Sequence, residues 1–385
     1  MDFMNPIAQQ QDMKTRRLRR NIVKTRRTVR DVTELNEGPW RWAIGIQTAI
    51  AIGVPLALFT LAGHLSYGLI ASLGGFTVMY AVSHTLRQRL IALPFVGTGL
   101  ILASMLGVLC AGNEWMTVAC LVVVTVISSI ITFGTGLGPP GPVMFVLVAA
   151  VSAQLAAPLR SAGASLTWYL IPSLVAAGAG LAYAVVAGLS ALPFLRNPPP
   201  AGPEGPPSLS FRIRLDKEMT MVTVRLIIGV IIAVLVSKQL GIHRSYWVIV
   251  ATAAILQAGP TRRLTTVRAI QRVLGTFLGV ALFELIHFFH PAGWWPVILI
   301  IVLQFATQVV IARNYVLGLF FITPIALVNT TIGQVDTLLT VRERVIDTLL
   351  GAGIALVVFW LEEWWRKSKE IPRLIKERIG TPSGE

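Results

Sequence analysis

Arginines set among apolar residues are the part of this sequence best suited to chemistry. In the stretch YWVIVATAAILQAGPTRRLTTVRAIQRVLGTFLG an apolar run stops at a Gly-Pro pair, and four arginines precede the next run. On a helix, Arg268, Arg272 and Thr276 lie on one face because they are spaced by four residues. Arg344 and Thr348 repeat this spacing in the last apolar segment. Two positive stripes of this kind are suited to binding an anion.

The alternative is that these arginines extend toward lipid head groups and only set the topology of the chain. This alternative is favoured for Arg262 and Arg263, which we place in a loop. Arg272 and Arg344 stand beside small residues that allow close helix contact, and ionisable residues inside membrane segments are costly to retain. For these two, both interpretations remain open.

Other polar residues extend the predicted site. Arg225 stands at the start of an apolar segment, and the segment 246–258 is short for a membrane span and ends at Gln257 and a Gly-Pro pair. A short helix is tolerated where it lines a cavity. The predicted substrate-binding residues are Arg225, Tyr246, Trp247, Gln257, Arg268, Arg272, Thr276, Arg344 and Thr348.

Two carboxylates are candidates for proton coupling. Asp347 follows Arg344 by three residues, and Glu284 precedes His287 by one helical turn. A carboxylate inside a membrane segment is costly and is often kept to carry protons. Pairing that only stabilises a helix is the alternative for both Asp347 and Glu284.

No pattern in the sequence indicates catalysis. We find no metal-ligand cluster, no phosphate-binding glycine loop and no nucleophile with a placed base, so neither an enzyme nor a cofactor is expected. Cys110 and Cys120 are too few for a disulfide framework and are predicted to be thiols in the membrane, with a periplasmic disulfide as the alternative.

The composition indicates which elements position these residues. Of 385 residues, 54% are hydrophobic and 13% are charged, whereas soluble domains have about a quarter of their residues charged. The net charge is +15, and 15 of the 33 Lys and Arg residues lie in the two tails. Basic residues beside membrane segments set topology and contact anionic lipids, so nucleic acid binding is not expected. The segment starting at Trp42 is predicted to stay in the membrane as a signal anchor.

The apolar runs predict an all-α, polytopic helical membrane protein with about twelve transmembrane helices. The expected spans are 42–61, 67–83, 90–109, 115–133, 143–157, 166–189, 221–240, 246–258, 273–289, 295–312, 315–332 and 345–364. With both termini on the cytoplasmic side, most Lys and Arg fall on that side, as the positive-inside rule requires.

Internal similarity predicts two related six-helix units. HLSYGLIASL in the first half resembles HRSYWVIVAT in the second, and the same separation takes Arg89 to Arg268. RVLGTFLG from Arg272 also resembles RVIDTLLG from Arg344 three spans later, which predicts an inverted repeat, with chance similarity as the alternative. The expected regions are a basic tail (1–38), the first unit (39–195), a Pro/Gly-rich linker (196–219), the second unit (220–364) and a basic tail (365–385).

The opening stretch resembles the signature of the fusaric acid resistance and aromatic acid exporter family. That signature has an aromatic followed by Trp, an apolar helix, a Pro-centred turn, two arginines and Gly-Thr with a later Gly. The matching positions are Tyr246, Trp247, Pro260, Arg268, Arg272, Gly275, Thr276 and Gly279. The resemblance covers roughly residues 221–360 and extends distantly to plant aluminium-activated malate transporters. It implies a bacterial inner-membrane protein that exports aromatic carboxylates or similar organic anions.

The leading hypothesis is therefore an exporter in which Arg272 and Arg344 hold a carboxylate and Tyr246 or Trp247 stacks on a ring. Because the sixth span has no arginine, the site is expected to rest on the second unit. A passive organic-anion channel and a non-transporting membrane scaffold for lipids or partner proteins are the alternatives. The expected partners are small organic anions, anionic lipids at the tails, a periplasmic adaptor protein and further copies of the chain.

Overall fold

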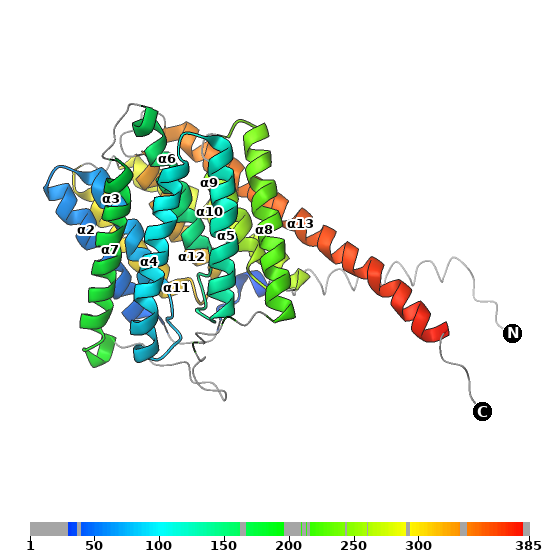
Figure 1. Cartoon of the computed structure of the whole chain (residues 1–385). Helices are drawn as coiled ribbons and strands as arrows, with labels where there is room; N and C mark the ends of the chain where they lie inside the picture. Colours follow the sequence, from blue (N-terminus) through cyan, green and yellow to red (C-terminus); the bar gives the residue numbers. More distant parts are fainter. Residues whose placement is uncertain are drawn as a thin grey trace, which may run out of the picture.

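A computed structural model gives the arrangement of the chain (Figure 1). It describes residues 30–36, 40–161, 167–195, 209, 213, 216–242, 245–259, 261–289, 293–331 and 337–379. Most of the expected N-terminal tail and linker, the end of the C-terminal tail, and Pro260 of the family signature lie outside the described residues.

The described part of the chain is helical and contains no strand, which confirms the all-α prediction. The apolar helices follow the order of the expected spans. The elements are α2 (Trp42–Leu61), α3 (Leu65–Gly74), η1 (Gly75–Met79), α4 (Leu86–Cys110), α5 (Glu114–Gly134), α6 (Val143–Ser161), α7 (Thr167–Leu189), η2 (Pro193–Leu195), α8 (Lys217–Gln239), α9 (Ser245–Leu256), α10 (Arg262–Phe288), α11 (Trp295–Val310), α12 (Tyr315–Thr331) and α13 (Thr337–Ile379).

Within the described residues, seven helices are long and apolar enough to cross a membrane: α2, α4, α5, α7, α8, α10 and α13. Helices α3, α6, α9, α11 and α12 are apolar but contribute shorter stretches of 10–17 residues. A span of the hydrocarbon core takes about 20 residues. The protein is thus a helical membrane protein with several spans, while the number twelve stays a prediction.

Helix α10 begins earlier than expected. The side chain of Thr261 accepts a hydrogen bond of 3.4 Å from the backbone N–H of Leu264, which caps the helix. The expectation that Arg262 and Arg263 lie in a loop is therefore wrong, since both belong to the first turn of α10. A threonine cap is a weak signal when no acidic residue follows it in the first turn.

The expected second span breaks where α3 gives way to η1. Gly74, the last residue of α3, lies against the backbone of α7, and a Cβ there would overlap the carbonyl oxygen of Val175. In a 3₁₀ helix, residues three apart lie on the same side because each turn has three residues. Phe76 and Met79 of η1 therefore face one direction.

Helix α13 is longer than the expected last span. It continues past 364 to Ile379 and runs out of the bundle, at the red end of the chain in Figure 1. Residues 365–371 contain no Gly or Pro and include several good helix formers, so the helix is not interrupted there. The start of the predicted C-terminal tail is thus helical.

The same pattern of neighbours occurs in both halves of the chain. Helix α4 packs against α6 and α7, and α10 packs against α12 and α13. Likewise α3 packs against α2 and α7, and α9 packs against α8 and α13. These neighbours form two groups of helices, α2–α7 and α8–α13. Contacts of α2 with α11 and of α5 with α8 join the two groups. In the second contact, Lys238 of α8 lies 3.0 Å from the carboxylate of Glu114.

Candidate functional site

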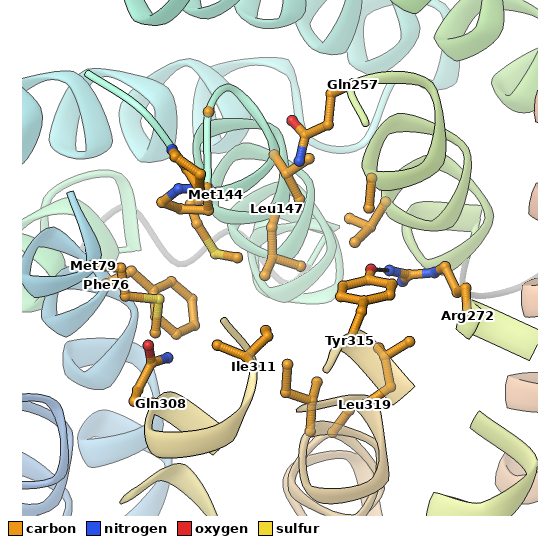
Figure 2. Close-up of a pocket in the computed structure, with 18 of the residues that line it drawn as sticks. Phe76, Met79, Met144, Leu147, Gln257, Arg272, Gln308, Ile311, Tyr315 and Leu319 are labelled. Atoms are coloured by element: carbon orange, nitrogen blue, oxygen red, sulfur yellow. Dashed lines mark hydrogen bonds between the residues drawn. The ribbon is translucent and has the colours of Figure 1, made fainter. Parts of the chain in front are cut away.

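A cavity of about 1560 Å³ lies between the two groups of helices. Its lining comes from α2, α3, η1, α5 and α6 in the first half of the chain and from α8 to α13 in the second half (Figure 2). Six of the predicted site residues line it: Tyr246, Trp247, Gln257, Arg268, Arg272 and Arg344. Within the described residues this cavity brings together side chains from both halves of the sequence, so we treat it as the candidate site.

Arg272 is a buried cation at this cavity. Its side chain belongs to α10, and the residue is only 4% exposed. Its Nη1 donates a hydrogen bond of 2.7 Å to the hydroxyl of Tyr315, and Figure 2 shows the two side chains meeting at the cavity. Within the described residues, its Nε has no hydrogen-bond partner. A guanidinium has five N–H donors, so Arg272 can also donate to a ligand.

Close packing of α10 against α12 places Arg272 next to Tyr315. A Cβ on Gly279 would lie 2.6 Å from the Cβ of Thr323 and 3.0 Å from the carbonyl oxygen of Leu319. Only a residue without a side chain permits this approach. Gly279 therefore allows the close contact between α10 and α12 that positions Arg272.

Arg344 is the second buried cation and reaches the cavity from α13. The residue is 4% exposed, and its guanidinium carbon lies 4.5 Å from the centre of the Trp247 ring. Gly351 brings α13 against α9, because a Cβ there would lie 2.6 Å from the Cβ of Ala251 and 2.8 Å from the carbonyl oxygen of Val248. A cation over an aromatic face is stabilised by the negative potential of the ring.

The electrostatics of the cavity favour an anion. Arg272 and Arg344 line the same cavity, and their like charges repel each other. Asp347 also interacts with Arg344 and is 1% exposed, but it does not line the cavity. Arg268 adds a third guanidinium, 4.1 Å from the centre of the Tyr315 ring. Buried cations in excess of carboxylates are stabilised by a bound negative charge.

Uncharged polar side chains also line the cavity. Gln257, Gln304 and Gln308 all line the cavity. Within the described residues, the buried Oε1 of Gln257 has no hydrogen-bond partner. Such an atom is costly unless water or a ligand donates to it. A hydrogen-bond donor on a ligand or water would therefore be stabilised next to Gln257.

Arg225 was predicted to bind substrate but does not line the cavity. Its Nη2 donates hydrogen bonds of 2.7 Å to the carbonyl oxygens of Leu256 and Gly259, where α9 ends. Its Nη1 lies 3.6 Å from the carboxylate of Glu362 in α13. A cation that satisfies the last carbonyls of a helix also complements the helix dipole. In the structure Arg225 fixes the end of α9 beside Gln257.

Three further predicted residues are also absent from the lining. Thr276 and Thr348 are each 2% exposed and pack between helices. Glu284 is exposed in the last two turns of α10 and is likewise absent. Spacing by four residues puts Thr276 and Thr348 on the same helix faces as Arg272 and Arg344. The arginine side chains are longer and reach the cavity, whereas the threonine side chains do not.

An N-terminal strap, defined here as residues 30–36, lies at the end of the cavity where α10 and α12 begin. Asp31 accepts two hydrogen bonds of 2.6 Å from the guanidinium of Arg263. Asn314 donates through Nδ2 to the carbonyl oxygens of Val32 and Glu34, at 3.1 and 3.3 Å. The strap contributes Asp31 and Glu34 to the lining. The charge of Arg263 therefore orders the N-terminal segment, a role the sequence did not reveal.

Arg263→Ala is expected to loosen the strap. The variant loses both hydrogen bonds to Asp31, so the backbone amide of Asn36, which donates 2.8 Å to the carbonyl oxygen of Arg313, should exchange with deuterium several-fold faster. Hydrogen–deuterium exchange of a peptide covering the strap measures this. Arg262→Ala is the matched control, because Arg262 lies 3.9 Å from Glu363 and not at the strap. Equal exchange in both variants would contradict the role of Arg263.

Sequence reasoning missed several lining residues. Tyr315 was not singled out, although its hydroxyl accepts the hydrogen bond from Arg272. Phe76 and Met79 were not singled out, because an apolar residue in an apolar run carries no signal of its own. Within the described residues, no group of three or more His, Cys, Asp or Glu side chains is placed to hold a metal ion.

Fold and cavity together define a helical membrane protein of several spans with a buried cationic site. Residues 226–358 match the family described as fusaric acid resistance protein-like, which confirms the resemblance seen in the sequence. The match includes both buried arginines of the cavity. The similarity to plant malate transporters stays a prediction.

Three curated relatives match over similar lengths. An uncharacterized membrane protein YvaC of Bacillus subtilis is 36% identical over a segment that covers 34% of this chain and 20% of the length of YvaC. An uncharacterized protein ORF2 of Neisseria gonorrhoeae is 30% identical over 37% of this chain and 34% of its own. An uncharacterized protein of Haemophilus influenzae is 30% identical over 37% of this chain and 20% of its own. The chain thus spans 20–34% of the length of these relatives. No solved structure matches the chain.

Proposed function

We propose that the protein transports organic anions and exports aromatic carboxylates or related acids across a bacterial inner membrane. The observation that carries this proposal is the pair of buried arginines, Arg272 and Arg344, at one cavity. Two neighbouring buried cations are costly unless a negative charge neutralises them. The match to the fusaric acid resistance family supports a transported anion as that charge.

The extent of the cavity supports a route through the bundle. At one end the lining includes Glu34 and Asn36, which precede α2, and at the other it includes Ser66, which follows α2. Helix α2 has 20 residues, a length of about 30 Å, which is close to the thickness of the hydrocarbon core. The same feature favours a passive organic-anion channel as the second candidate function.

The arginines and aromatic residues that line the cavity each have a defined part in this proposal. Arg272 and Arg344 hold the carboxylate, because a guanidinium can form paired hydrogen bonds to its two oxygens. Tyr315 and Trp247 orient these two guanidiniums, so Tyr246 is the predicted aromatic residue available in the lining to contact the substrate ring.

Repeated contacts support an internal symmetry. Arg272 of α10 contacts the tyrosine that begins α12, and Arg344 of α13 contacts Trp247 and interacts with Tyr246 at the start of α9. This correspondence is what an inverted repeat of three helices predicts. The shared neighbour pattern of α2–α7 and α8–α13 likewise supports two related six-helix units. In the proposal the two units enclose the anion route.

For proton coupling the proposal retains Asp347, because it is buried and interacts with the substrate-binding Arg344. Glu284 lacks this support, since it is exposed and does not line the cavity. Cytoplasmic termini, anionic lipids at the basic tails, a periplasmic adaptor and further copies of the chain remain parts of the proposal that rest on sequence.

Flux measurements on the full chain in lipid vesicles test this function. We expect labelled 4-hydroxybenzoate to move across the membrane, and to move against its concentration gradient when a proton gradient is imposed. Movement only down the concentration gradient would identify a channel instead. Vesicles without protein are the control. If neither an aromatic acid nor any other organic anion moves, both candidate functions are wrong.

A further inference from the structure

The part of the cavity lining that η1 and the start of α6 supply, opposite Arg272, is apolar (Figure 2). Phe76 and Met79 lie on one side of η1 because they are three residues apart, and Met144 and Leu147 have the same spacing on α6. All four are half-buried, whereas the residues directly before and after each of them are buried. Their remaining exposed surface therefore faces the cavity (Figure 2). We call these four residues the apolar wall.

The two walls differ in charge. Among the described lining residues from α2 to α6, no side chain is charged. The opposite wall has Arg268 and Arg272 from α10 and Arg344 from α13. A ligand that contacts both walls without leaving charges unpaired needs an anionic end and an apolar body.

The cavity has room for a body larger than one ring. Its volume of about 1560 Å³ exceeds the range of about 300–1,000 Å³ that is usual for pockets of drug-sized ligands. A single-ring acid held at Arg272 would leave most of the apolar wall in contact with water. An anion with a larger apolar body buries more of this surface, and apolar burial is favourable. Methionine side chains adapt to different shapes, which suits Met79 and Met144 to such ligands.

We propose that the apolar wall, Phe76, Met79, Met144 and Leu147, determines specificity by selecting anions whose apolar body is larger than one ring. The proposal rests on the assignment of the cavity as the anion site of a transporter. It divides the site between the two groups of helices: the second group binds the negative charge, and the first group selects the body of the substrate.

A series of carboxylates with the same charge and increasing apolar size tests this proposal. Acetate, benzoate and 2-naphthoate are titrated into the purified full chain in detergent by calorimetry, and flux of each acid is measured separately in vesicles. We expect affinity to rise along the series. Phe76→Ala and Met144→Ala should each reduce the preference for naphthoate over benzoate by about tenfold and leave acetate binding unchanged, because only the larger bodies reach the apolar wall.

Matched controls exist on α4. Phe95 is 69% exposed and Met105 is 47% exposed, and neither lines the cavity. Phe95→Ala and Met105→Ala should keep the preference of the parent protein. Met144→Phe, which narrows the cavity instead of enlarging it, is expected to weaken naphthoate binding selectively, so the test does not depend on one variant folding.

The outcomes separate this proposal from the proposed function. Equal affinity of the parent for benzoate and naphthoate, or an unchanged preference in Phe76→Ala and Met144→Ala, would overturn the role of the apolar wall even if anions are transported. A preference that is lost in these variants supports the apolar wall even if no flux is observed, in which case transport is the assignment that fails.

Discussion

Arg272→Ala is expected to reduce flux of an aromatic acid by more than about tenfold. The variant removes a buried guanidinium from the cavity and leaves the hydroxyl of Tyr315 without its donor. A hydrogen bond to a charged group contributes about 1.5–3 kcal/mol, and about 1.4 kcal/mol corresponds to a factor of ten. Arg272→Lys should retain part of the flux, because lysine keeps the charge but not the planar pair of donors. Initial rates in vesicles that contain equal amounts of protein measure the effect.

The matched control is Arg262→Ala on the same helix. The side chain of Arg262 is 57% exposed at the start of α10 and does not line the cavity. Its loss should leave flux unchanged, which excludes a general effect of removing positive charge. Tyr315→Phe removes only the hydrogen bond to Arg272 and should give an intermediate rate. Parental flux in Arg272→Ala would exclude Arg272 as a substrate-binding residue.

Gly178→Ala is expected to destabilise the bundle by about 1–3 kcal/mol or more. Gly178 of α7 lies against α3, and a Cβ there would overlap the carbonyl oxygen of Ala71. The obstacle is backbone and not the end of a flexible side chain, so the two helices must separate. Because η1 directly follows α3, the shift would also move Phe76 at the cavity. Thermal unfolding in detergent, followed by tryptophan fluorescence, should show a midpoint lower by several degrees.

Gly180→Ala on the same helix is the control with the opposite expected sign. A Cβ on Gly180 would have no atom within 4 Å apart from its own helix and its chain neighbours. Alanine favours a helix over glycine by up to about 1 kcal/mol, so this variant should be as stable as the parent or slightly more stable. If Gly178→Ala and Gly180→Ala have the same midpoint, α3 and α7 do not pack as closely as the structure shows.

Hydrophobic patterning predicted most of the fold. Apolar runs separated by polar or Gly/Pro-rich turns mark membrane helices, and the described helices follow these runs in order. Boundaries were predicted less well where local hydrogen bonds decide them. Because Thr261 caps α10, this helix begins earlier than the predicted span and includes Arg262 and Arg263. At Gly74 the second expected span passes from α3 into the 3₁₀ helix η1, close to the backbone of α7.

The positions of the arginines along their helices came from sequence, but their partners did not. In the sequence, Arg225, Arg263 and Arg272 each stand in or beside an apolar run. In the structure Arg225 satisfies the end of α9, Arg263 holds the N-terminal strap and Arg272 lines the cavity. No local pattern distinguishes these roles, since each depends on what packs opposite the guanidinium.

The sequence by itself determined an all-helical membrane protein, the family that its second half resembles and the helices that carry the buried cations. These properties follow from composition, period and short motifs, all of which are local along the chain. Tertiary structure alone decided which side chains pair with the arginines, because these contacts join distant residues. Arg263 and Asp31 are separated by 232 positions, and Arg272 and Tyr315 by 43. It also decided that the first half supplies the apolar wall, because an apolar side chain gains a role only from the surface it faces.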